Sequence, residues 1–107
     1  MASNVFVLDY LLKTGPISLR DLVTRMSSMP ELATRLAELT SSGEIELEGD
    51  RDAIRRLNLV LRTTEEEAAA QPDVVLARLQ TSLNEIPGAK QVRVRLSESA
   101  FRRALKR

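Results

Sequence analysis

The side chains of this sequence that could take part in chemistry are carboxylates, guanidinium and amino groups, hydroxyls and a single tyrosine. The chain of 107 residues contains no histidine and no cysteine. It therefore lacks an imidazole for acid–base catalysis, a thiol nucleophile and the Cys/His sets that bind zinc. Since no motif arranges the remaining groups into a catalytic set, we expect a protein that is not an enzyme, needs no metal or cofactor and has no evident small-molecule substrate.

Charged side chains are the remaining functional candidates, and they are unevenly distributed. The chain has 16 basic and 15 acidic residues, which gives a net charge of +1. Residues 18–52 nevertheless hold four arginines against eight carboxylates. Three of these carboxylates alternate with apolar residues: Glu44, Glu46 and Glu48. A basic group follows them: Arg55, Arg56 and Arg62. Because phosphates attract basic and repel acidic surfaces, the two groups favour different partners.

The apolar periodicity around these charges predicts three helices followed by a β-hairpin. Ser18 occupies an N-cap position, with Asp21 three residues later to complete a variant of the capping box. Gly43 can adopt the left-handed conformation that ends a helix, and a strand begins directly after it. The expected helices cover residues 5–13, about 19–27 and from Pro30 to Gly43, and the expected strands cover residues 44–48 and 55–62.

The hairpin interpretation depends on alternation. In residues 55–62, Leu57, Leu59 and Leu61 occur at every second position, so they would share one face of a strand. This strand would pair with residues 44–48, in which the glutamates alternate with apolar residues. Leu59 and Val60 are both apolar, so one of them must lie on the outer face of this hairpin. A second protein surface could cover it there.

The last 45 residues also predict regular structure. The periodicity indicates a helix over residues 72–86, a half-buried strand over residues 91–96 and a short terminal helix that Ser97 caps. A run of three glutamates at residues 65–67 is typical of a solvated helix start and does not indicate a metal site.

The order helix, short extended step, helix, helix and hairpin resembles the winged-helix variant of the helix-turn-helix fold. The resemblance covers residues 4–62 and is most specific at an L-x-x-L-x-x-x-G-x-I pattern: Leu36, Leu39, Gly43 and Ile45. It implies an α+β fold, a three-helix winged helix-turn-helix with a β-hairpin wing, plus a C-terminal helix–strand–helix extension. We expect a winged-helix domain over residues 1–63 and an extension over residues 64–107 that packs on it or forms a dimer interface.

This resemblance implies a DNA-binding protein in transcription regulation, with the third helix in the major groove and the wing against the backbone. Thr34 and Arg35 would contact base edges of double-stranded DNA, and Ser28 would also touch the DNA. Phosphates would be contacted by Arg55 and Arg56 or by the basic cluster at the C-terminal end of the chain. The acidic strand departs from this pattern, because a wing with so many carboxylates would be repelled by the DNA backbone.

The alternative interpretation is a winged-helix module for protein–protein interaction or dimerisation that does not bind DNA. Its contact residues would be Glu44, Glu46, Glu48 and Val60. A homodimer is consistent with both interpretations. The chain has no apolar run of the roughly 18–20 residues that span a membrane and no charged start before its first apolar stretch, so we expect a cytoplasmic protein without membrane contact.

Overall fold

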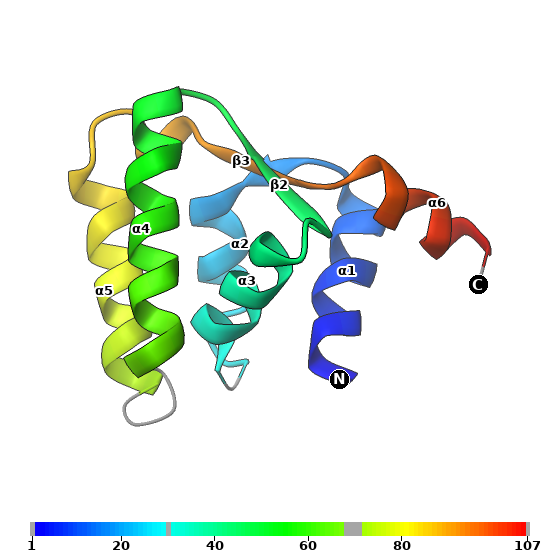
Figure 1. Cartoon of the computed structure of the whole chain (residues 1–107), viewed down its shortest axis with the longest axis horizontal. Helices are drawn as coiled ribbons and strands as arrows, with labels where there is room; N and C mark the ends of the chain where they lie inside the picture. Colours follow the sequence, from blue (N-terminus) through cyan, green and yellow to red (C-terminus); the bar gives the residue numbers. More distant parts are fainter. Residues whose placement is uncertain (1, 30, 68–71, 107) are drawn as a thin grey trace.

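The computed structural model describes residues 2–29, 31–67 and 72–106 (Figure 1). These residues form an α+β fold of six α-helices, one short 3-10 helix and a small antiparallel sheet. The elements are, in chain order, α1 (Ala2–Thr14), β1 (Ile17–Ser18), α2 (Leu19–Arg25), α3 (Leu32–Ser41), β2 (Ile45–Glu48), α4 (Arg51–Glu67), α5 (Pro72–Glu85), η1 (Ala89–Gln91), β3 (Arg93–Leu96) and α6 (Glu98–Lys106).

The sheet joins distant parts of the chain. Its strand order is β1-β3-β2, and both neighbours of β3 are antiparallel to it. Ile17 of β1 and Leu47 of β2 are both paired with Val94 of β3. The C-terminal segment therefore supplies the central strand, and residue 63, where the sequence suggested a domain boundary, lies inside α4.

Three predicted helix ends are confirmed by their hydrogen bonds. The Ser18 hydroxyl accepts a hydrogen bond from the Asp21 backbone N–H at 3.0 Å, at the start of α2. Gly43 has a φ of 77°, and the following N–H of Glu44 donates to the Leu39 carbonyl oxygen at 3.0 Å. Ser97 accepts from the Ala100 N–H at 3.2 Å at the start of α6. The expected first turn of α3 at Pro30 lies outside the described residues.

The predicted return strand over residues 55–62 is wrong, because these residues belong to α4. The buried side chains Ala53, Leu57 and Leu61 recur every four residues, whereas Leu59 is 56% exposed. Asp50 supplies the N-cap, since its carboxylate accepts from the Ala53 N–H at 2.9 Å. Leucine and arginine are strong helix formers, so local propensity and burial agree on a helix. The predicted hairpin between residues 44–48 and 55–62 therefore does not form.

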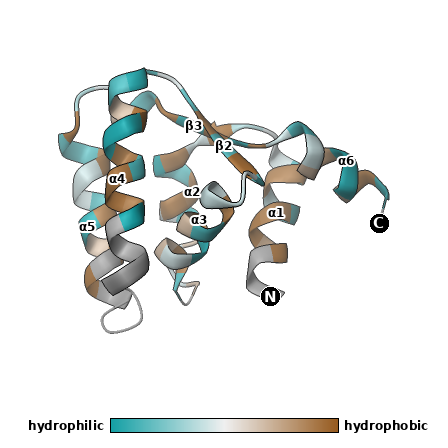
Figure 2. Ribbon diagram, viewed as in Figure 1, coloured by the Kyte–Doolittle hydropathy of each residue, from teal (hydrophilic) through white to brown (hydrophobic). Residues whose placement is uncertain are grey.

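The helices pack around one hydrophobic core. In Figure 1, α4 and α5 lie side by side, and α6 lies at the opposite end of the molecule. α4 packs against α3 and α5, while α5 also contacts α2. Hydrophobic and hydrophilic residues alternate along α4 in Figure 2, as expected for a helix with one buried face. The core includes Leu22 of α2, Leu36 of α3, Leu57 of α4, Leu79 of α5 and Val94 of β3.

None of the described helices combines the length and the apolar composition that a membrane span requires.

Candidate nucleic-acid interface

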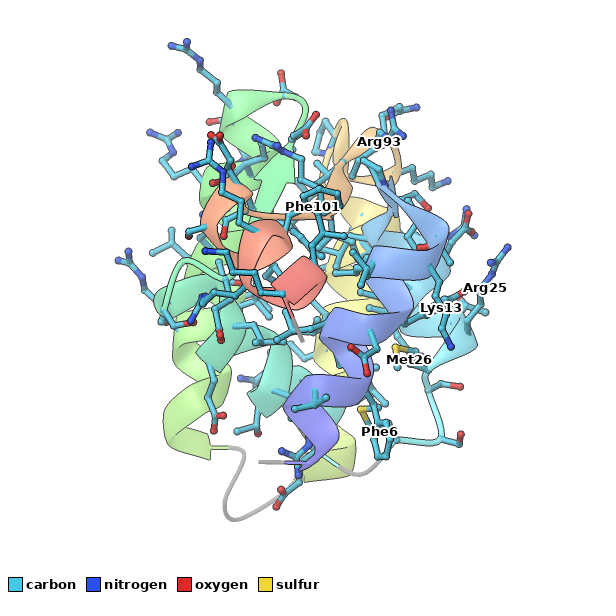
Figure 3. The ribbon with its side chains drawn as sticks, turned by 90° about the vertical axis from the view of Figure 1, so that its right-hand side faces the viewer. Phe6, Lys13, Arg25, Met26, Arg93 and Phe101 are labelled. Atoms are coloured by element: carbon cyan, nitrogen blue, oxygen red, sulfur yellow. The ribbon has the colours of Figure 1, made fainter. Side chains whose placement is uncertain are left out.

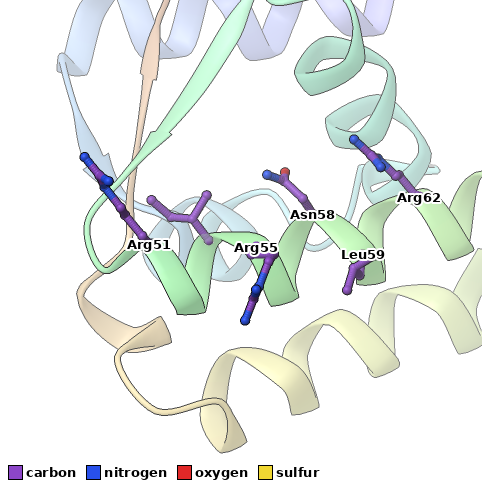
Figure 4. Close-up of a pocket in the computed structure, with 6 residues that line it drawn as sticks. Arg51, Arg55, Asn58, Leu59 and Arg62 are labelled. Atoms are coloured by element: carbon purple, nitrogen blue, oxygen red, sulfur yellow. The ribbon is translucent and has the colours of Figure 1, made fainter.

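The outer side of α4 carries a stripe of long polar side chains. Arg51, Arg55, Asn58 and Arg62 follow one another at spacings of four, three and four residues, which places them on one face of a helix. Together with Ile54 and Leu59 they line one shallow pocket (Figure 4). We call these four residues the α4 basic face.

The three arginines of the α4 basic face differ in their ion pairs with the described side chains. Arg55 is paired with Asp52, whose other carboxylate oxygen lies 3.2 Å from Nε of Arg56. Among the side chains that the structure describes, neither Arg51 nor Arg62 has an ion-pair partner. Exposed guanidinium groups that no described carboxylate pairs with favour an anionic partner.

Asn58 lies between two shallow pockets. It lines the pocket of the α4 basic face and a second one with Thr40 and Ser41 at the end of α3. Its Oδ1 atom is buried and has no hydrogen-bond partner among the described residues. Buried amide oxygens in proteins are nearly always hydrogen-bonded. Rotation about χ2 exchanges the positions of the amide oxygen and nitrogen, so Asn58 can offer either a donor or an acceptor to a ligand in one of these pockets.

The α3 residues that were expected to contact base edges are partly buried and lie near carboxylates, which is unfavourable for DNA binding. Thr34 and Arg35 are half-buried, and a guanidinium nitrogen of Arg35 lies 3.5 Å from the carboxylate of Glu31. Glu31 and Glu38 are exposed along the same helix. Ser28 is exposed in the turn that follows α2. The outer surface of α3 is therefore acidic, while its other side packs against α4.

The expected acidic wing is a strand whose carboxylates have basic partners. The β2–β3 register places Glu46 opposite Arg95, and the carboxylate of Glu46 lies 2.8 Å from the guanidinium of that arginine. Arg95 also pairs with Glu48. Glu44 lies 3.6 Å from Arg103 of α6. These partners come from the C-terminal segment, and they offset the charge that residues 18–52 carry by themselves.

Of the neighbouring apolar residues Leu59 and Val60, the structure exposes Leu59 and not the expected contact residue Val60. Val60 is half-buried and packs against the core, whereas Leu59 is the exposed residue and adjoins the α4 basic face. Arg55 and Arg56 are both exposed on α4, as phosphate contacts would need to be.

Sequence reasoning missed Arg51 and Asn58 altogether, although a signal was present. Once Ala53, Leu57 and Leu61 are taken as one helical face at spacings of four, the opposite face follows from the same periodicity. In the part of the chain that the structure describes, no group of three acidic side chains is arranged to hold a metal ion.

We compared the chain with models of known protein families, with curated proteins and with solved structures, and none of the three comparisons found a match.

Proposed function

We propose that this chain is a variant of the winged-helix fold that binds double-stranded DNA through the α4 basic face and acts in transcription regulation. Two features support the fold assignment. A short extended step leads from α1 into the consecutive helices α2 and α3, and β2 and β3 are antiparallel neighbours, as the strands of a wing hairpin are. Residues 49–92, which contain α4 and α5, stand where a wing would have a short loop.

The observation that carries the functional proposal is the α4 basic face itself. Three arginines and one asparagine occupy a single helical stripe, and none of the described residues that line its pocket is acidic. Arginine is the side chain best suited to phosphate oxygens, and one amide atom of Asn58 can form a hydrogen bond with a base edge. The stripe therefore combines groups for positioning on the backbone with one group for reading a base.

The dimensions of this stripe suit a major groove. Arg62 lies eleven helical positions after Arg51, which corresponds to about 16 Å along the helix axis. The major groove of B-DNA is about 12 Å wide, so side chains at the two ends of the stripe can reach phosphates on both strands. Asn58 lies between these ends and would face the bases. In Figure 1, α4 lies in front of α5, and Arg51, Arg55 and Arg62 of this helix are exposed.

The test compares wild type with Arg51→Gln/Arg62→Gln for binding to a random duplex at several salt concentrations. Each phosphate contact contributes about 0.9 to the slope of log K against log salt, so the double variant should lose about 1.8 of that slope and bind about 60-fold more weakly at about 0.1 M salt. A random duplex is sufficient, because phosphate contacts do not depend on sequence. Fluorescence anisotropy of a labelled duplex provides the measurement.

A matched control variant distinguishes the loss of the α4 basic face from a general loss of positive charge. Lys13→Gln/Arg20→Gln removes two exposed charges from α1 and α2 and changes the net charge by the same amount. It should retain nearly all of the affinity and slope. Equal losses in the two double variants, or a wild type that does not bind duplex DNA at low salt, would contradict DNA binding through α4.

One observation favours the alternative of a protein partner. Leu59 is 56% exposed and lines the same pocket as the arginines. An apolar side chain surrounded by arginines would suit an acidic, amphipathic helix of another protein. Leu59→Ala should leave the affinity for random DNA unchanged, because a leucine contributes no counterion release. If wild type does not bind DNA at low salt, the result would favour a protein partner at this face.

A further inference from the structure

A second surface, remote from α4, is apolar and exposed. On α6, Phe101 is 44% and Leu105 is 62% exposed, and on the adjacent α1, Val5 is 38% exposed. In Figure 1 these helices lie at the end of the molecule opposite α4 and α5. Figure 3 shows Phe101 on α6 and Phe6 on α1; Phe6 is not part of this surface, because it does not line the groove between the two helices, whereas its neighbour Val5 does. We call Val5, Phe101, Leu105 and the groove beside them the α1–α6 surface.

A groove runs between the two helices of the α1–α6 surface. Its apolar lining consists of Val5 and Leu8 from α1 and Ala100 and Ala104 from α6. The two alanines leave room that larger side chains would fill. Glu44 and Arg103, which lie 3.6 Å apart, form the polar part of the lining. The same surface thus carries both an apolar depression and, on the next stripe of α6, two protruding apolar side chains.

This combination fits a second copy of the same chain. An interface about a two-fold axis uses one patch on both subunits, so that patch must contain a protrusion and a matching depression. Phe101 and Leu105 supply the protrusion, and the groove supplies the depression. An unrelated partner would not require the two features to lie side by side on one patch.

The charges of α6 select one orientation of the two copies. Glu98 lies in the first turn of the helix, where it also pairs with Arg102, and Arg103, which lies near Glu44, and Lys106 lie in its last turn. In an antiparallel pair of α6 helices, each acidic start lies near the basic end of the other helix, whereas a parallel pair brings like charges together. The helix dipoles favour the antiparallel arrangement as well.

We propose that two copies of this chain associate through their α1–α6 surfaces, with the α6 helices antiparallel and with Phe101 and Leu105 of each copy in the groove of the other. Because α4 lies at the opposite end, both α4 basic faces stay exposed in this dimer. If the proposed function is correct, the dimer presents two DNA-binding faces. The association itself does not depend on that function.

The experiment measures the mass of the full-length chain by sedimentation velocity across a range of concentrations, without DNA. Wild type should shift from monomer to dimer as its concentration rises. Phe101→Glu should raise the dimer Kd by about 100-fold or more, because the interface would bury a carboxylate without a partner. Val74→Glu is the matched control, since Val74 of α5 is 50% exposed and far along the chain from α6. The control should associate like wild type.

A charge swap tests the orientation without an apolar change. Glu98→Lys should weaken association, and Glu98→Lys/Lys106→Glu should restore it if the helices are antiparallel. Circular dichroism of each variant verifies that the monomer stays folded. A wild type that is monomeric at all concentrations, or a folded Phe101→Glu that dimerises like wild type, would overturn the proposal. Neither result would affect the DNA-binding test, which uses other residues and another readout.

Discussion

Leu57 and Leu59 provide the sharpest test of the α4 helix, because they are the same residue type only two positions apart. Leu57 is completely buried, whereas Leu59 is 56% exposed. Successive positions in a strand alternate between its two faces, so residues two apart share one environment. In a helix the same two residues are about 200° apart. Leu57→Ala and Leu59→Ala should therefore have very different effects on the free energy of unfolding.

The magnitudes follow from the burial of each side chain. Emptying a fully buried leucine site costs about 2–5 kcal/mol, which includes the cavity that remains. Leu59 buries less than half of its side chain, and at about 0.8 kcal/mol for each fully buried methylene its truncation should cost about 1 kcal/mol or less. A difference of about 1–4 kcal/mol corresponds to a difference in Tm of about 5–20 °C in a domain of this size.

Urea unfolding followed by circular dichroism measures both variants. Leu57→Met is the control for Leu57, since it nearly conserves volume and should cost less than about 1.5 kcal/mol. The dependence of free energy on urea should be the same in all variants, because the folded state does not change. Equal losses for Leu57→Ala and Leu59→Ala would refute the helix and restore the hairpin strand.

Three further predictions concern the parts of the chain around the sheet. Leu36→Ala should lower the free energy of unfolding by about 2–5 kcal/mol in the same urea assay, since Leu36 is fully buried in the core. Gly43→Val should cost about 1–2 kcal/mol more than Gly43→Asn, because a φ of 77° strains a β-branched residue while asparagine tolerates it, and an equal loss would remove this argument. Arg95→Gln should cost about 0.5–1 kcal/mol, since it leaves Glu46 and Glu48 without their shared partner, and the loss should shrink at high salt, as measured by thermal unfolding.

Much of the secondary structure could be predicted from the sequence where local signals were unambiguous. Ser18 and Ser97 fit N-cap positions, Gly43 fits a helix end, and the structure bears out all three. The alternation in residues 91–96 also predicted the strand that became β3. In each case a specific side chain or a clear period determined the local conformation, so the surrounding fold was not needed.

The error in residues 55–62 has an equally specific origin. Leu57, Leu59 and Leu61 satisfy a strand period, while Ala53, Leu57 and Leu61 satisfy a helical one, and short apolar segments often fit both. The pairing of β2 explains why residues 55–62 are not a strand. The strand β3 pairs with β2 in place of these residues, so residues 51–62 can form a helix. Sequence periodicity gives no information on pairing between residues 45–48 and 93–96, which are far apart in the chain.

The pairing of β2 with β3 also changes how the acidic charge of residues 18–52 is interpreted. Summed along the sequence, residues 18–52 form an acidic segment, and this argued against a nucleic-acid partner. In the fold, Glu46 and Glu48 have Arg95 as their partner and Glu44 has Arg103, so these carboxylates are largely neutralised by the C-terminal segment. Arg51 and Arg62 have no ion-pair partner among the described side chains and lie on one helical face with Arg55. A chain with a net charge of +1 can therefore present a basic surface, because its acidic residues are concentrated where other arginines meet them.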